Sequence, residues 1–215
     1  NSIEDITPLG NLPHLHTLDL AYNRVESLAP LSPLGELQEL KVQGNHLTSL
    51  TGLERLTNLR SLNVSDNPIE NLEPLRGLSN LEHLSARGVG IDDVSPLVGL
   101  TALRSLDLSN NRIESVDPLR NLVELRTLRL DANRISDLTA LVDLRRLENL
   151  SAVQNDIRYI EPLADLPGLI TADLSLNDIG FLGGWLELEG APKVITMGNP
   201  LVDTGLAQST MEAVR

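Results

Sequence analysis

The sequence has no cysteine and very few aromatic residues, and both absences narrow what the protein can be. Without cysteine the chain has no disulfide bond, no thiol nucleophile and no cysteine ligand for a metal. Aromatic residues make up only 2% of the chain, whereas hydrophobic residues as a whole make up 41%. We therefore expect a core built from thin layers of slim aliphatic side chains.

The chain also has no excess of positive charge. The formal net charge is −13 at pH 7, which argues against binding the phosphate backbone of a nucleic acid or an anionic membrane surface. No run of apolar residues approaches the length of about 18 that a membrane span needs, so we expect no membrane insertion. Basic or neutral proteins are the partners that fit this composition best.

One motif returns along the whole chain at a constant interval. Residues 103–113 read LRSLDLSNNRI, and this L-x-x-L-x-L-x-x-N-x-I pattern recurs every 22 residues, so that equivalent positions form columns. Such a period is typical of the leucine-rich repeat, in which each repeat adds one short strand to a parallel sheet. We predict an α/β leucine-rich-repeat solenoid, a curved right-handed horseshoe whose concave sheet has about nine short strands. The column of the motif's asparagine contains Asn1, Asn23, Asn45, Asn67, Val89, Asn111, Asn133, Asn155, Asn177 and Asn199.

We interpret the asparagine column as structural. Each amide carries a donor and an acceptor, so it can satisfy buried backbone groups where the chain turns away from the strand. Val89, between Gly88 and Gly90, cannot make these hydrogen bonds. We therefore expect the ladder of amides to be interrupted at Val89 and the turn there to be altered.

The second half of most repeats contains a proline followed by leucine. Proline fixes φ and suits the first turn of a short helix. Only a few residues are available on this side, so we predict short 3-10 or helical segments on a thin convex face. The pairs lie at residues 8–9, 30–31, 74–75, 96–97, 118–119 and 162–163.

Together these two motifs resemble the repeats of bacterial internalins, with their N-x-I-x-x-L-x-P-L-x-x-L-x-x-L-x-x-L-x-L pattern, over essentially the whole chain. The resemblance implies a bacterial protein that binds a partner protein through its concave face. It favours a secreted or cell-surface location and leaves a cytoplasmic one open. Two other interpretations remain: an intracellular repeat scaffold of the regulatory-subunit type, and a structural spacer within a larger multidomain protein.

The repeats set the expected domain boundaries. We predict a repeat array over residues 1–190 and, over residues 191–215, a degenerate last repeat followed by a C-terminal cap. The chain opens without Met, in the middle of a repeat and without an N-terminal cap. We interpret it as part of a longer chain with further domains on its flanks, and expect any targeting signal to lie outside it.

Positive charge collects on the predicted concave columns of the middle repeats, although the chain as a whole is acidic. Arginine can hold a carboxylate through two parallel hydrogen bonds and is common in binding hot spots. The alternative is a solvated face on which the charges pair with one another. The predicted partner-binding residues of this region are Arg60, Asn63, His83, Arg87, Arg104, Asp107, Arg126 and Arg129.

Several columns that are polar in the earlier repeats become apolar in the last ones. Val153, Ile170 and Leu176 occupy columns that are polar in most earlier repeats, and Ile195 and Met197 follow them. A contiguous exposed apolar patch usually marks a contact surface, so we add Val153, Ile170 and Leu176 to the predicted binding residues. The patch could equally be covered by the tail of the chain, residues 202–215.

Nothing in the sequence supports an enzyme. A Gly-rich phosphate loop, a nucleophile elbow and metal-ligand spacing are all missing from it, and the four histidines occupy unrelated registers. We therefore expect no catalytic site, no metal and no other cofactor. Asn-x-Ser sequons begin at Asn63 and Asn149, both on predicted strands, where chance occurrence is the default interpretation.

Overall fold

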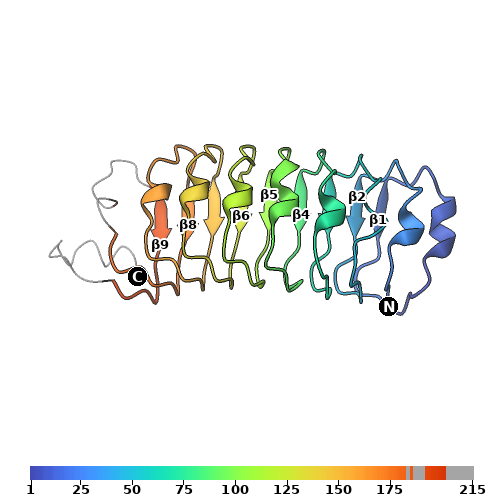
Figure 1. The fold of residues 1–215 in the computed structure, drawn as a ribbon, viewed down its shortest axis with the longest axis horizontal. Coiled ribbons are helices and arrows are strands. Elements are labelled where there is room, and N and C mark those ends of the chain that lie inside the picture. The colour runs from blue at the N-terminus through green and yellow to red at the C-terminus, as the bar shows by residue number, and fades with distance from the viewer. Residues whose placement is uncertain (183–184, 186–191, 202–215) are drawn as a thin grey trace.

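The repeats stack into one elongated solenoid in the computed structural model, which describes residues 1–182, 185 and 192–201 (Figure 1). Nine parallel strands form one sheet, and their order in the sheet follows the sequence. Each strand pairs with the next at an offset of one repeat, as Leu18 does with Leu40, so the predicted fold and strand positions are confirmed. The strands are β1 (Thr17–Asp19), β2 (Glu39–Lys41), β3 (Ser61–Asn63), β4 (His83–Ser85), β5 (Ser105–Asp107), β6 (Thr127–Arg129), β7 (Asn149–Ser151), β8 (Thr171–Asp173) and β9 (Lys193–Ile195).

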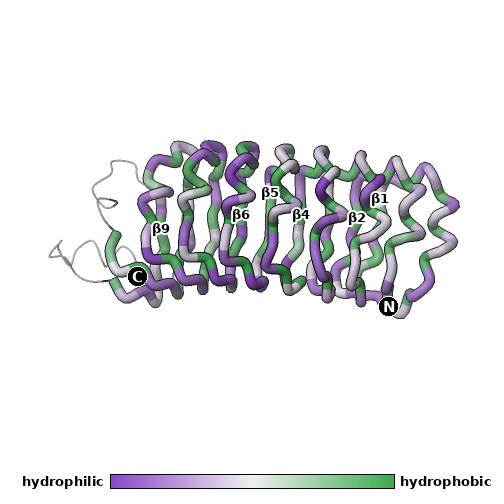
Figure 2. Tube along the Cα trace, in the orientation of Figure 1, coloured by the Kyte–Doolittle hydropathy of each residue, from purple (hydrophilic) through white to green (hydrophobic). Residues whose placement is uncertain are grey.

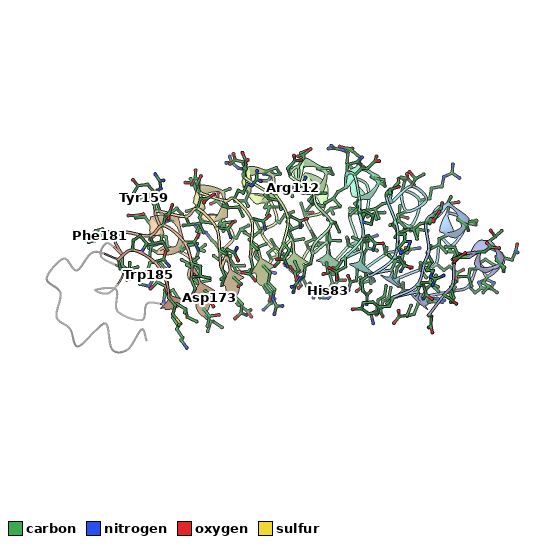
Figure 3. All side chains as sticks on the ribbon, turned by 90° about the horizontal axis from the view of Figure 1, so that it is seen from below. His83, Arg112, Tyr159, Asp173, Phe181 and Trp185 are labelled. Carbon is green, nitrogen blue, oxygen red and sulfur yellow. The ribbon has the colours of Figure 1, made fainter. Side chains whose placement is uncertain are left out.

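Short 3-10 helices return the chain on the side away from the sheet, and the solenoid bends gently with the sheet on its inner side (Figure 3). Each of the six proline-leucine pairs named above opens such a helix, as the sequence predicts, because proline already has the φ that the first turn needs. The helix at Thr139 forms with Ala140 in the place of proline, so the proline is favourable but not required. The helices are η1 (Thr7–Asn11), η2 (Ala29–Leu31), η3 (Glu73–Leu75), η4 (Ser95–Gly99), η5 (Asp117–Leu119), η6 (Thr139–Leu141) and η7 (Glu161–Leu163).

Aliphatic side chains fill the space between the sheet and the returning segments. In the central repeat Leu103, Leu106 and Leu108 are fully buried, and equivalent residues form one cluster from Ile6 to Trp185. Figure 2 shows hydrophobic residues recurring at matching places in successive coils. Because each layer touches only its two neighbours, stability is a sum of repeat and nearest-neighbour terms. Among the described residues, no helix is long and apolar enough to cross a membrane.

The asparagine column forms a ladder of side-chain hydrogen bonds, as predicted. The Nδ2 of Asn45 donates to the carbonyls of Leu20 and Val42, both at 2.9 Å. Its Oδ1 accepts from the backbone N–H of Val25 at 2.9 Å. Each amide therefore joins the turn of its own repeat to the turn of the preceding repeat. The same three contacts recur at Asn67, Asn111, Asn133, Asn177 and Asn199.

The ladder is interrupted at Val89, also as predicted. The N–H of Ile69, which would meet an asparagine side chain, donates instead to the backbone carbonyl of Asn67 at 2.9 Å. Asn111 compensates on the other side, since its Oδ1 accepts from three consecutive N–H groups, those of residues 89, 90 and 91, at 3.2, 2.9 and 3.2 Å. Gly90 has a φ of +84°, so the turn here does differ from the others.

A second column, made of the residues that directly precede the asparagine-column positions 23 to 199, has a left-handed backbone. This left-handed column was not predicted from the sequence. The φ angles lie between 52° and 74°, a region in which a side chain costs about 1 kcal/mol relative to glycine. Two members of the left-handed column, Tyr22 and Leu176, each lie over a glycine of the next repeat. A Cβ built on Gly44 would be 2.6 Å from the Tyr22 ring, and one on Gly198 would be 2.6 Å from Leu176 Cδ2. The column is Tyr22, Gly44, Asp66, Gly88, Asn110, Ala132, Gln154, Leu176 and Gly198.

Two adjacent asparagines test the ladder. We expect Asn111→Ala to lower the free energy of unfolding by about 3 kcal/mol or more, because it leaves several backbone donors and acceptors without a partner. Asn110→Ala, one residue earlier and exposed, should cost less than about 1 kcal/mol. Urea denaturation of both variants measures the difference, and equal losses would contradict a structural role for the ladder.

Candidate partner-binding surface

The concave face is built from the residues that flank the buried centre of each strand. In β5, Leu106 is fully buried while Ser105 and Asp107 on either side are half-buried and face outward. Repeated from β2 to β6, this alternation gives a shallow depression of about 330 Å³ in the middle of the sheet. The polar residues that line the depression are Lys41, Ser61, Asn63, His83, Ser85, Ser105, Asp107, Thr127 and Arg129.

Three of the predicted arginines form ion pairs along one margin of this face. The Glu82 carboxylate lies 2.7 Å from Arg60 Nη1 and 3.6 Å from Arg104 Nε, so it bridges two repeats. Arg126 pairs in the same way with Glu148 of the next repeat. The arginines are more than half exposed, with side-chain exposures of 62%, 56% and 55%. Exposed pairs of this kind contribute little to stability, so an incoming carboxylate can replace the internal partner.

The other two predicted arginines, Arg87 and Arg129, are exposed, and neither lies within ion-pair distance of a carboxylate in the part of the chain that the structure describes. Arg87 reaches across to Asn110, whose amide oxygen, in the orientation that satisfies both side chains, accepts from Nε at 2.8 Å and from Nη2 at 3.0 Å. Arg129 lines the central depression. Neither charge is therefore neutralised by a carboxylate of the described residues, although Nε and Nη2 of Arg87 already donate to Asn110.

The remaining polar residues of the predicted set are Asn63, Asp107 and His83. The first two bind the backbone, and the third is exposed. Asn63 and Asp107 are half-buried, and each accepts a hydrogen bond at 3.0 Å from the backbone N–H two residues later, which ends its strand. His83 is exposed on the concave face, on the same side as Asp173 (Figure 3). Lys41, which is not among the residues predicted from the sequence, also lines the depression.

Lys41 is held in its charged form by its neighbours. Its Nζ lies 2.8 Å from a carboxylate oxygen of Glu39. The hydrogen bond that Lys41 donates to Glu39 raises the pKa of Lys41 above its usual value; the negative charge of Glu39 and, more weakly, that of Asp19 raise it further. Lys41 and Arg129 therefore place positive charge in strands at opposite ends of the depression.

The far end of the concave face is apolar and accessible. Ile170, Leu176 and Met197 are 60%, 55% and 63% exposed, while Val153 and Ile195 beside them are half-buried. Of the two outcomes that the sequence left open, exposure or coverage by the tail, Ile170 and Leu176 show exposure. The C-terminal cap predicted from the sequence, residues 202–215, lies outside the described residues.

The concave face is close to electrically balanced. Four columns of side chains face outward here, those that contain Arg60, His83, Arg87 and Asp107. They carry equal numbers of basic and acidic side chains, so the excess negative charge of the protein lies on its other surfaces. The basic residues are Lys41, Arg60, Arg87, Arg104, Arg126, Arg129 and Lys193, and the acidic residues are Asp19, Glu39, Glu82, Asp107, Asp131, Glu148 and Asp173.

A second column of polar residues, missed by the sequence analysis, caps the 3-10 turns. Each residue of this capping column accepts a hydrogen bond, at 2.8–3.3 Å, from the backbone N–H two residues later. Tyr159 and Phe181 replace the capping residue in the last two described repeats. The signal was present in the sequence as short polar residues at one fixed position: Asp5, Ser27, Ser49, Asn71, Asp93, Ser115 and Asp137.

Titratable side chains do not gather into a metal site in the described part of the chain. No group of three or more His, Asp or Glu side chains is placed to hold an ion there. His14 and His16 instead lie 3.2 Å and 3.8 Å from Glu36, near the N-terminal end. The concave surface therefore offers hydrogen bonds, ion pairs and apolar contact.

Sequence comparison identifies the repeats. The family described as "Leucine Rich repeats (2 copies)" matches residues 36–77, 79–121 and 101–143, and the family "Leucine Rich repeat" matches residues 11–27. No curated protein sequence matches the chain.

Solved structures are similar over most of the chain. An internalin of Listeria monocytogenes, InlF, is 32% identical with a TM-score of 0.88, and the match covers 95% of this chain and 61% of that one. A second internalin of the same organism, InlC2, is 34% identical with a TM-score of 0.81, covering 84% of this chain and 80% of that one. A leucine-rich-repeat protein of Leptospira interrogans, at 20% identity, a TM-score of 0.86, and coverage of 97% of this chain and 60% of that one, shares the fold. The chain thus spans 61% of InlF, the first of these structures.

We expect the ion pairs of the concave face to contribute little to the stability of the fold, and two variants test this. We expect Glu82→Gln, which removes the charge that Arg60 and Arg104 share, to change the free energy of unfolding by about 1 kcal/mol or less. Leu106→Ala, in the core of the neighbouring strand, should cost about 2–5 kcal/mol. Chemical denaturation distinguishes the two, and a loss at Glu82 as large as that at Leu106 would show that these arginines hold the fold together.

Proposed function

Because the chain belongs to the internalin-type leucine-rich-repeat proteins, we propose that it is a non-catalytic module that binds a partner protein through its concave face. The leucine-rich-repeat fold typically serves protein–protein interaction, since stacked repeats present one extended surface. We propose in addition that the protein is bacterial, that it is secreted or displayed at the cell surface, and that further domains flank it in a longer chain.

The observation that carries this proposal is the pairing of two chemistries on one face. Exposed arginines lie along the middle repeats, and the exposed aliphatic side chains of Ile170, Leu176 and Met197 follow at the C-terminal end. A partner segment that fits this face presents carboxylates to the middle repeats and an aliphatic anchor to the last ones. The apolar end supplies burial of surface, and the arginines supply orientation and specificity.

Charge outside the concave face strengthens the selection of an acidic partner segment. The protein as a whole repels acidic molecules, because its net charge is −13. On the concave face the charges balance, and Arg87 and Arg129 have no carboxylate partner there among the described residues. An acidic segment is therefore admitted at this face and disfavoured elsewhere.

The alternative functions differ in what they require of this face. A structural spacer needs no exposed aliphatic patch, so the exposure of Ile170, Leu176 and Met197 favours a binding role. An intracellular scaffold of the regulatory-subunit type would also bind proteins, and cellular location rather than the geometry of the face separates it from a secreted module.

Peptide selection tests the proposed face. We expect peptides selected from a random display library on the wild-type protein to be rich in Asp and Glu. The double variant Arg104→Glu, Arg126→Glu should bind them about ten-fold or more weakly, because two attractive charges become repulsive. The matched control is Arg76→Glu, Arg120→Glu, which reverses the same number of exposed, ion-paired arginines next to η3 and η5. Binding that the control abolishes and the concave variant preserves would overturn the proposal.

The apolar end is tested by removing one side chain without straining the backbone. Leu176 has a φ of +57°, in a column where glycine is found in other repeats, so Leu176→Gly fits the turn. We expect the free energy of unfolding to change by about 1 kcal/mol or less, while peptides selected for an aliphatic anchor bind about five-fold or more weakly. Isothermal titration with those peptides measures this, and unchanged affinity would remove Leu176 from the binding surface.

A further inference from the structure

Two exposed aromatic rings lie on the turn side of the solenoid, away from the proposed binding face. The chain has only four aromatic residues, one Trp, two Tyr and one Phe. Tyr159 and Phe181 are 70% and 52% exposed, whereas Trp185 is buried. Figure 3 places Tyr159 on the opposite side of the molecule from Asp173 and His83, with Phe181 beyond it at the same end. They occupy one column in consecutive repeats, so they follow one another along the solenoid.

These rings stand where every earlier repeat uses a capping residue. In the seven preceding repeats that residue accepts a hydrogen bond from the N–H two residues later, as Asp137 does from Thr139 at 2.8 Å. A phenol oxygen at the far end of a ring cannot reach that N–H, and phenylalanine has no acceptor. The last two described repeats therefore replace a stabilising contact with accessible apolar surface, which usually marks a contact site.

Tyr159 also borders a groove with a volume of about 800 Å³ between two successive turns. Three carboxylates, those of Asp137, Asp156 and Glu161, line this groove with a single cation, Arg158. The Arg158 guanidinium lies 3.9 Å from the carboxylate of Asp178, so its charge is shared with a further acid. Hydrogen bonds from the Thr139 side chain and backbone lower the pKa of Asp137, which keeps that carboxylate charged at neutral pH.

We propose that this groove, together with the adjacent Phe181, is a second docking site, and that it takes a segment of a partner protein bearing arginine or lysine. The occupant follows from charge and from the rings together. Carboxylates on the walls attract a guanidinium or ammonium group, and the exposed Tyr159 ring supplies an aromatic face over which such a cation can stack. The site is chemically opposite to the concave face, so one module can hold two different partner segments at once.

The N-terminal end of the solenoid contains a natural comparison. A smaller groove, of about 400 Å³, lies at the same register and is lined by Glu4, Asp5 and Glu26. Arg24 lies in it, 3.4 Å from Glu4. Ser27 occupies the column of Tyr159 and caps its turn. This groove is acidic but has no aromatic wall, so it shows what charge alone provides.

The test uses two fluorescein-labelled peptides, one of alternating arginine and glycine and one of alternating glutamate and glycine, with binding followed by fluorescence anisotropy at about 150 mM salt to screen diffuse attraction. Wild-type protein should bind the arginine peptide, and any binding of the glutamate peptide, which the concave face admits, should be the same in wild type and in the variant described next. The double variant Tyr159→Ser, Phe181→Ser leaves the net charge unchanged and introduces the capping residue found at Ser27. It should bind the arginine peptide about five-fold or more weakly, with a thermal midpoint equal to or above that of wild type.

Two further variants make the result specific. Ser27→Tyr places a ring at the N-terminal groove and should strengthen binding of the arginine peptide to the Tyr159→Ser, Phe181→Ser background. Leu176→Gly alters the concave face without changing any charge and should leave binding of the arginine peptide within about two-fold of wild type, so the groove is tested separately from the concave face. Equal affinity of wild type and the Tyr159→Ser, Phe181→Ser variant for the arginine peptide would show diffuse electrostatic attraction and overturn the proposal, as would an equal loss of glutamate-peptide binding in that variant.

Discussion

The hydrogen bonds of the asparagine side chains are the constraint on which the rest of the structure depends. Wherever the chain leaves a strand, it enters a left-handed turn and leaves backbone N–H and C=O groups inside the protein without a partner in the sheet. One amide per repeat satisfies groups of its own turn and of the preceding turn. Because that arrangement repeats without insertion, side chains one repeat apart stay in register, and surfaces can form as columns.

The regular parts of the molecule could be predicted from sequence because they depend on spacing. The leucine period placed all nine strands, and the proline-leucine pairs placed six of the 3-10 helices. The interruption at Val89 was also predictable, since valine lacks an amide. In contrast, the pairing of Glu82 with both Arg60 and Arg104 depends on the rotamers of long side chains in three repeats, which no spacing rule specifies. The left-handed column was hidden because six of its nine members are not glycine.

The location of the candidate site could be predicted from the sequence, whereas the hydrogen bonds and ion pairs of its side chains could not. Exposure of the arginines and of Ile170 and Leu176 follows from their columns, because the strand alternation fixes which side chains face outward. The engagement of Asn63 and Asp107 with the backbone does not follow from those columns, and it leaves the arginines, His83 and Lys41 as the polar groups best able to meet a partner. The aromatic groove stands out only when the capping column is recognised, because Tyr159 and Phe181 are exceptions to a rule that the other repeats define.

The left-handed column has a consequence for how such an array can grow. Tyr22 lies over Gly44 and Leu176 lies over Gly198, so in these places the residue in one repeat determines which residue the next repeat can carry. A copy of the repeat containing Tyr22, inserted directly after itself, would bring one tyrosine onto the space that Gly44 leaves open for the other. Neighbouring repeats in this protein are thus matched pairs rather than interchangeable units, and duplication can lengthen the array only at junctions where the two left-handed residues fit together.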